Sequence, residues 1–212
     1  FNVLHEFAGA GSTWAMQAYL HMTNDGQTST QAAGHGTIHA GGNSVADIPC
    51  VYDEWMHFRL HVDTDLDVAE FYYSTESNPT ETMLCTWQWS LDSFGESTVG
   101  RKLDAMNFFP PENASTSEFY IDNVGVVVAS NDEVLIADDF EAYTVDNKIA
   151  VEAQAAGNDW WTTWSENPGS AEDGVVATNG SKCGHLTYNN DQVLLLGGYE
   201  SGTYDLSFDI LV

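Results

Sequence analysis

Basic side chains are scarce in this chain, which has 5 Lys and Arg against 32 Asp and Glu and a formal net charge of −27. A surface so acidic repels phosphate backbones and anionic lipid, so nucleic acid is not expected as a partner and membrane surfaces are poor partners. The same charge favours a salty environment or bound divalent cations. No apolar run approaches the ~20 residues that a membrane span needs, so no membrane insertion is expected. Hydrophobic residues still make up 43% of the chain, enough for a core.

Cysteine is also rare, and Cys50, Cys85 and Cys183 show no spacing typical of a zinc site. Two arrangements remain open: a disulfide between Cys50 and Cys85 with one free thiol, or three buried thiols. A phosphate-binding loop, a nucleotide fingerprint and a Ser-His-Asp order are all missing. We therefore expect a protein that is not an enzyme.

Helical periodicity is nearly absent, whereas apolar and polar residues alternate along residues 13–22, 55–62 and 203–212. The residues that this alternation places on shared faces are Trp14, Met16, Ala18 and Leu20; Met56, Phe58, Leu60 and Val62; and Tyr204, Leu206, Phe208 and Ile210. Strands with one apolar face need a second sheet to cover them, so the sequence predicts an all-β, two-sheet antiparallel sandwich. Residues 147–157 form either a short helix or a crossing loop.

Several segments resemble the laminin-G-like, concanavalin-type jelly rolls. They are "DEWMHFRLHVDTDLDVAEFYY", "FNVLHEFAGAGSTWAMQAYL", "TWQWSLDSFG", "AMNFF", "FYIDNV" and "DDFEAYTV…WWTTWSENPGSAEDGVV". Together they are similar to a module of large secreted bacterial surface proteins, often present as tandem copies, and they cover nearly the whole chain. The resemblance implies a jelly-roll fold and a secreted, extracellular or cell-surface location. The start at Phe1 rather than Met is expected of a mature or trimmed product.

The order of these segments is circularly permuted relative to that module. Residues 1–125 resemble its C-terminal part, residues 126–135 form a joint that reads as a hairpin, and residues 136–212 resemble its N-terminal part. Neither part can bury its apolar strand faces alone. Residues 136–212 therefore complete either their own chain, giving one unit over residues 1–212, or a neighbouring chain.

The chain ends suggest a function. The module normally joins "LSFDILV" (206–212) to "FNVLHEF" (1–7) as neighbouring strands, so here both strands should end on the outside of the fold. Exposed strand ends and edges are templates for a strand of another chain. We therefore expect a non-enzymatic structural or adhesive subunit that associates with copies of itself, head to tail or as a tandem repeat, in an extracellular assembly.

The resemblance also implies a structural calcium ion bridging the first and last strands of the module. The matching residues are Asp122, Asp139 and Glu141. Carboxylates and nearby carbonyls supply the hard oxygens that Ca²⁺ requires. The other interpretation is that these are solvated acids on an acidic protein.

A carboxylate-rich run, Asp65-Leu-Asp67-Val-Ala-Glu70, is similar to the catalytic strand of β-jelly-roll glycosidases. Its first residue is Asp rather than Glu, and the resemblance places residues 63–67 at a hairpin turn. An Asp-rich turn is therefore the preferred interpretation, and a glycoside hydrolase is only the third candidate function.

Aromatic residues support the second candidate function, a carbohydrate-binding, lectin-like module that recognises polysaccharide. Sugar rings stack on flat Trp platforms, and Trp87, Trp161 and Trp164 are the candidates. The alternative for each of them is a place in the sandwich core.

Overall fold

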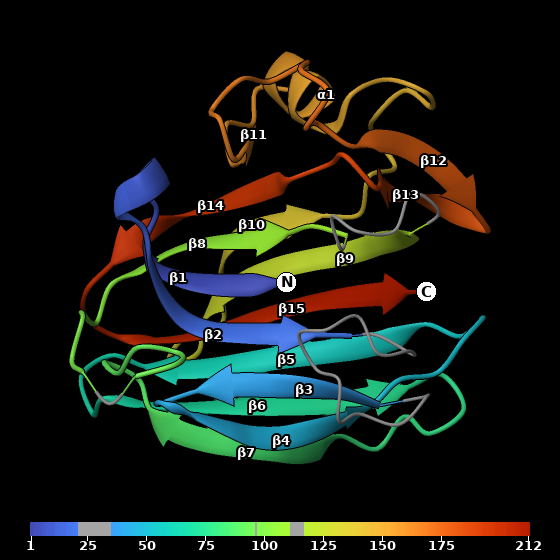
Figure 1. Cartoon of the computed structure of the whole chain (residues 1–212). Coiled ribbons are helices and arrows are strands. Elements are labelled where there is room, and N and C mark those ends of the chain that lie inside the picture. Colours follow the sequence, from blue (N-terminus) through green and yellow to red (C-terminus); the bar gives the residue numbers. More distant parts are fainter. Residues whose placement is uncertain (21–34, 96, 111–116) are drawn as a thin grey trace.

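The structure is a computed structural model that describes residues 1–20, 35–95, 97–110 and 117–212. It consists of two packed antiparallel sheets, so the predicted all-β sandwich is confirmed (Figure 1). The seven-stranded sheet has the order β11 (Trp161–Thr163), β14 (Gln192–Tyr199), β8 (Leu103–Phe108), β1 (Asn2–Glu6), β2 (Thr13–Tyr19), β3 (His35–Ala40), β4 (Asn43–Pro49). The other sheet has the order β12 (Val175–Asn179), β13 (Ser181–Thr187), β9 (Glu118–Val128), β15 (Thr203–Leu211), β5 (Met56–Asp63), β6 (Val68–Thr75), β7 (Thr82–Gln88), and β10 (Glu133–Asp138) pairs with β9.

Alternation on β5 and β15 builds the centre of the core. The predicted inward residues of both strands are buried: Met56, Phe58, Leu60, Val62, Tyr204, Leu206, Phe208 and Ile210. Phe58 pairs directly with Phe208 and stacks on it with a centroid distance of 5.4 Å. Each buried aromatic ring of this kind contributes about 1.5–3 kcal/mol through its removal from water.

The C-terminal part of the chain completes the sandwich within the same chain. Strand β15 lies between β5 and β9, and β1 lies between β2 and β8 in the opposite sheet. Both strands are therefore interior strands and offer no free edge to a strand of another chain. The buried ring of Phe1 contacts that of Phe208 across the sandwich, with a centroid distance of 5.0 Å.

The joint between the two parts is a hairpin, as predicted. Residues 124–128 of β9 pair with β10 around the turn at 129–132. The first half of β9 pairs instead with β13. Between the two halves, Asn123 takes a left-handed φ of 51°, and the register against β15 shifts there. This β-bulge lets one long strand serve two different neighbours.

A single α-helix is present in the described chain, α1 (Ile149–Ala155), so the helical interpretation of residues 147–157 holds for a shorter stretch. It buries Ile149 and Ala150. The side chain of Asp173 accepts a hydrogen bond of 3.0 Å from the Ala150 amide, which satisfies one of the free amides of the first turn. No helix in the described part of the chain is long and apolar enough to cross a membrane.

The three cysteines are buried free thiols, so the predicted Cys50–Cys85 disulfide is not formed. Cys85 lies on β7, and Cys50 follows β4 in the opposite sheet. Both belong to the apolar core, where a thiol packs as a small hydrophobic group. The alternative arrangement, three buried thiols, is the one that the structure has.

Candidate functional site

The outer face of the seven-stranded sheet carries a row of polar side chains across four strands. Val3 and Met16 are paired and face the core, so their neighbours Asn2 and Gln17, also paired, face outward. Asn2 pairs on its other side with Asn107 of β8, and Gln17 pairs with His39 of β3. Direct cross-strand partners lie on one face of a sheet. Residues far apart in sequence therefore form one continuous polar row.

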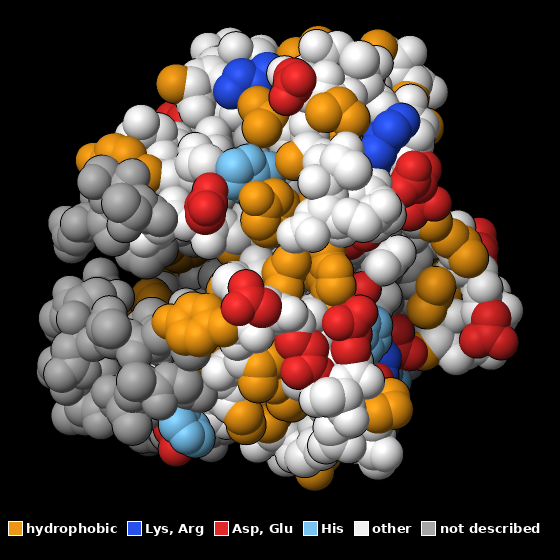
Figure 2. Space-filling model, turned by 90° about the vertical axis from the view of Figure 1, so that its right-hand side faces the viewer, with side chains coloured by type: hydrophobic (Ala, Val, Ile, Leu, Met, Phe, Trp, Pro, Cys, Tyr) orange, Lys and Arg blue, Asp and Glu red, His pale blue; other side chains and the backbone are white. Residues whose placement is uncertain are grey.

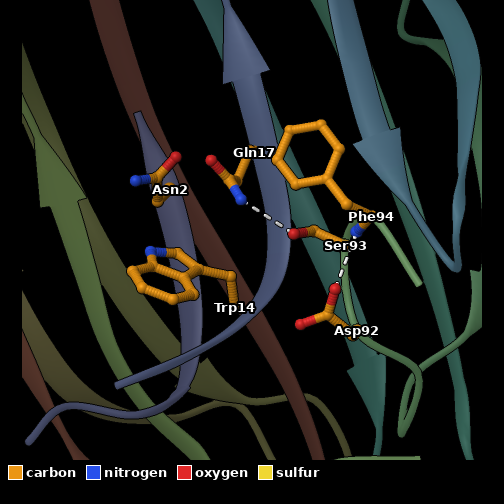
Figure 3. Close-up of a pocket in the computed structure, with 6 residues that line it drawn as sticks. All are labelled: Asn2, Trp14, Gln17, Asp92, Ser93 and Phe94. Atoms are coloured by element: carbon orange, nitrogen blue, oxygen red, sulfur yellow. Dashed lines mark hydrogen bonds between the residues drawn. The ribbon is translucent and has the colours of Figure 1, made fainter. Parts of the chain in front are cut away.

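A hollow of about 380 Å³ lies over this row. Its lining consists of Asn2, Trp14, Gln17, Asp92, Ser93 and Phe94. Trp14 lies on one side, Phe94 lies on the other, and the contact between Gln17 and Ser93 spans the space between them (Figure 3). Aromatic rings and hydrogen-bonding groups thus face a shared cavity.

The loop that closes the hollow is held in place by hydrogen bonds. The Ser93 amide donates to the Trp14 carbonyl at 2.9 Å, and the Gly42 amide donates to the Asp92 carbonyl at 3.1 Å. The side-chain amide of Gln17 donates to the Ser93 hydroxyl at 2.9 Å. Asp92 and Phe94 are therefore positioned before any ligand arrives, which lowers the entropy cost of binding.

Two amides beneath the site have unmet hydrogen-bonding capacity. Asn2 is 5% exposed and Asn107 is 4% exposed, and the side-chain oxygen of each has no hydrogen-bond partner among the described residues. A buried polar atom without a partner costs about 1–3 kcal/mol. Such groups are commonly kept where a ligand or water completes them.

Aromatic side chains extend the site along the sheet. The Trp164 ring stacks on Trp14 with a centroid distance of 6.4 Å and an interplanar angle of 11°, and Phe7 packs against the edge of Trp164. On the other side of the hollow, Phe94 is 52% exposed, and its ring contacts that of His39 with a centroid distance of 4.5 Å. The outer face therefore presents an aromatic belt with a polar hollow in its middle.

Of the three Trp residues predicted to bind sugar, the structure brings only Trp164 to this face. Trp87 and Trp161 are buried in the sandwich core, so no sugar ring can stack on them. Trp161 is fixed there by a hydrogen bond of 2.8 Å from its indole nitrogen to the buried Asp138 carboxylate. Trp14, one of the two aromatic residues that line the hollow, faces away from the core, although the alternation of its segment predicts that it shares a face with Met16.

The glycosidase-like run lies at a turn, as the preferred interpretation has it. Residues 64–67 connect β5 to β6, and Asp67 has a left-handed φ of 60°. Its carboxylate accepts hydrogen bonds from the amide and hydroxyl of Ser90 and from the Gln88 side chain, and it pairs with Arg101. These contacts tie the turn to the chain after β7, which is a structural role.

The three predicted calcium ligands lie near the start of β13 but make separate contacts. Asp122 accepts a hydrogen bond from the Ser181 hydroxyl at 3.0 Å, and Glu141 accepts one from the Lys182 amide at 2.8 Å. The Asp139 carboxylate accepts a hydrogen bond of 3.1 Å from the Glu141 amide. The described residues contain no group of three or more His, Cys, Asp and Glu arranged to hold a metal ion. Calcium at these residues stays a prediction.

Charge on the surface follows the composition. On the end of the sandwich where the C-terminus lies, acidic side chains are spread widely and Lys and Arg are few (Figure 2). Two of the five basic residues, Arg101 and Lys102, line a second hollow, and each is paired with a carboxylate, of Asp67 at 3.1 Å and of Asp104 at 3.0 Å. Both basic side chains that line this second hollow are therefore in ion pairs.

Comparison with known proteins adds no family to this description, because no family model matches the chain and no curated protein matches it either. The similarity to laminin-G-like modules of bacterial surface proteins, and with it the permuted order, stays a prediction.

Proposed function

We propose that the protein is a carbohydrate-binding module that holds a glycan on the outer face of its seven-stranded sheet. The observation that carries the proposal is the hollow between Trp14 and Phe94, with the amides of Asn2 and Gln17 beneath it. Sugar rings have apolar faces that stack on aromatic side chains and hydroxyl groups that pair with amides and carboxylates. This face offers both kinds of contact within one cavity.

Binding without hydrolysis is the proposed outcome. Glycoside hydrolysis ordinarily needs a pair of carboxyl groups that flank the scissile bond. The described lining of the hollow includes one carboxylate, that of Asp92. Asp65, Asp67 and Glu70, the carboxylates of the glycosidase-like run, are not among the residues that line it.

The test measures glycan binding by variants in which a residue that lines the hollow is replaced. Phe94→Ala removes an exposed ring and Gln17→Ala removes an amide, and each should weaken glycan binding about tenfold or more. Tyr52→Ala is the matched control, because Tyr52 is 56% exposed and lies outside the hollow. Glycan-array binding that both lining variants leave unchanged would contradict the proposal, and so would a wild type that binds no glycan.

A second proposal is that the protein associates with copies of itself as a structural or adhesive subunit outside the cell. Because β1 and β15 are interior strands, association would use a sheet edge. Strand β7 favours this: it ends its sheet, contains no charged residue or Pro, and exposes 51% of Met83. Unprotected edges of this kind pair with strands of other chains.

The second proposal is tested by placing a positive charge on the β7 edge. Met83→Lys should abolish oligomers or filaments seen by sedimentation velocity and negative-stain microscopy. Leu66→Lys adds the same charge at the exposed β5–β6 turn and should leave them intact. A wild type that sediments only as a monomer at high concentration refutes the proposal.

A further inference from the structure

We propose that the ligand of this hollow is an amino-sugar glycan whose amino groups are protonated, such as an oligomer of glucosamine. This inference rests on the proposed carbohydrate-binding function and names the class of glycan. Three features carry it: the placement of Asp92, the aromatic walls beside it, and the sign of the charge around the site.

Asp92 is the one charged residue among the described residues that line the hollow. One of its carboxylate oxygens accepts a hydrogen bond of 2.9 Å from the Phe94 amide, which fixes the orientation of the group. The other oxygen points toward Trp14 (Figure 3). No hydrogen bond within the described chain occupies that second oxygen, so it is available to a ligand.

The aromatic walls suit a cation. Trp14 and Phe94 both line the hollow that Asp92 enters. The face of an aromatic ring attracts an ammonium group, and Trp does so most strongly. A protonated amino group can therefore contact a ring and pair with the carboxylate in the same cavity, whereas a neutral hydroxyl gains only the weaker hydrogen bond.

The surrounding charge favours the same ligand. No Lys or Arg is among the described residues that line the hollow, and the chain as a whole carries a formal charge of −27. Arg101 and Lys102, which line a second hollow, form ion pairs with Asp67 and Asp104. A field of this sign concentrates cationic ligands and repels glycans that carry uronate or sulfate groups.

The remaining lining supplies contacts for the sugar hydroxyls. Asn2 lies in the floor of the hollow and is 5% exposed. Its side-chain oxygen has no hydrogen-bond partner in the described structure. Gln17 is held in position by its bond to Ser93. The site therefore combines a fixed carboxylate, two aromatic walls and an amide floor.

The experiment compares three oligosaccharides of equal length by titration calorimetry: glucosamine, N-acetylglucosamine and glucose oligomers. The acetyl group of N-acetylglucosamine removes the positive charge of the amino group and leaves the sugar ring unchanged. We expect the glucosamine oligomer to bind about tenfold more tightly than the other two. The preference should shrink at high salt and above the pKa of the sugar amine, because screening and deprotonation both remove the charge interaction.

Asp92→Asn tests the assignment to this carboxylate, since the amide oxygen can still accept the Phe94 amide. The variant should bind all three oligomers with similar affinity. Glu133→Gln, an equal charge change on the exposed start of β10, should keep the preference. Equal binding of charged and neutral oligomers by the wild type, or a preference that survives Asp92→Asn, overturns the inference and leaves carbohydrate binding standing. Failure of every oligomer and of a wider glycan array to bind overturns the proposed function itself.

Discussion

The side-chain amide of Gln17 donates a hydrogen bond of 2.9 Å to the hydroxyl of Ser93, which joins the floor of the hollow to the loop that carries Asp92 and Phe94. Ser93→Ala removes this bond while the Ser93 amide still donates to the Trp14 carbonyl. We expect a loss of about 1 kcal/mol in the free energy of unfolding, measured in urea. Glycan affinity should fall as well, because the loop is no longer held in its binding position.

The control for this variant is Ser201→Ala, at an exposed position outside the hollow. It should change neither the unfolding midpoint nor the affinity. A Ser93→Ala protein with wild-type affinity would show that the loop does not need this bond to hold its place.

Strand alternation predicted the core strands well, because both faces of β5 and β15 follow a simple period of two. It failed at Trp14. The register between β1 and β2 shifts near Leu4, so Trp14 faces outward although Met16 and Ala18 face the core. A bulge of this kind depends on the partner strand, and the sequence of one strand does not reveal it.

The hollow could not be predicted for a related reason. Its lining comes from β1, from β2 and from the loop after β7, so residues 2 and 94 meet only through the sheet topology. The predicted disulfide is not formed for the same reason: sequence spacing does not say how far apart two cysteines lie when they are in opposite sheets. Abundant Trp indicated that some aromatics could bind sugar, and burial decided which ones.

His5 should make the protein sensitive to acid. Burial lowers the pKa of His5 below its ordinary value of 6.5, against the opposing effects of the Trp89 carbonyl and the carboxylates of Asp92 and Asp67. The unfolded chain then binds more protons than the folded chain. His5 therefore costs no stability above pH 6.5, and stability is lost as the pH falls below that value toward its folded pKa.

His5→Gln tests this, because a glutamine amide can still donate to the Trp89 carbonyl, which His5 now contacts at 2.7 Å. The decrease in unfolding free energy between pH 8 and pH 5 should be smaller in this variant than in the wild type. His35→Gln, at an exposed position, should behave as the wild type does. Identical pH profiles for all three proteins would contradict the prediction.

Asp138 is a buried acceptor for several donors, and its loss should be costly. The Tyr143 hydroxyl donates to it at 2.6 Å, the Trp161 indole at 2.8 Å and the Phe140 amide at 3.0 Å. Asp138→Ala leaves these buried donors without a partner, so we expect a loss of about 3 kcal/mol or more in the free energy of unfolding. The exposed neighbour gives the control: Asp139→Ala should cost less than about 1 kcal/mol. Urea denaturation followed by Trp fluorescence measures both.

Calcium binding can be tested at Asp122. Burial raises the pKa of Asp122, and the charges of Asp209 and Asp139 raise it further, so a cation at this point would relieve repulsion. We expect a higher melting temperature in CaCl₂ than in EDTA with NaCl at equal ionic strength. The difference should disappear in Asp122→Asn. An equal melting temperature in the two buffers would refute calcium binding, and a difference that persists in the variant would place the ion elsewhere.

The three thiols should be inert in the native protein and all reactive once it unfolds. Burial raises the pKa of Cys50 to about 11, of Cys85 to about 12 and of Cys183 to about 11, so almost no thiolate exists at pH 8. Because the thiolate is the reactive form, iodoacetamide should leave the native protein unmodified and add three groups in denaturant without reductant. Ser201→Cys places a thiol at an exposed position and should react in the native state, which shows that the reagent is active. Addition of only one group to the denatured wild type would mean that two cysteines are joined, and the pairing of Cys50 with Cys85 would return as the first arrangement to examine.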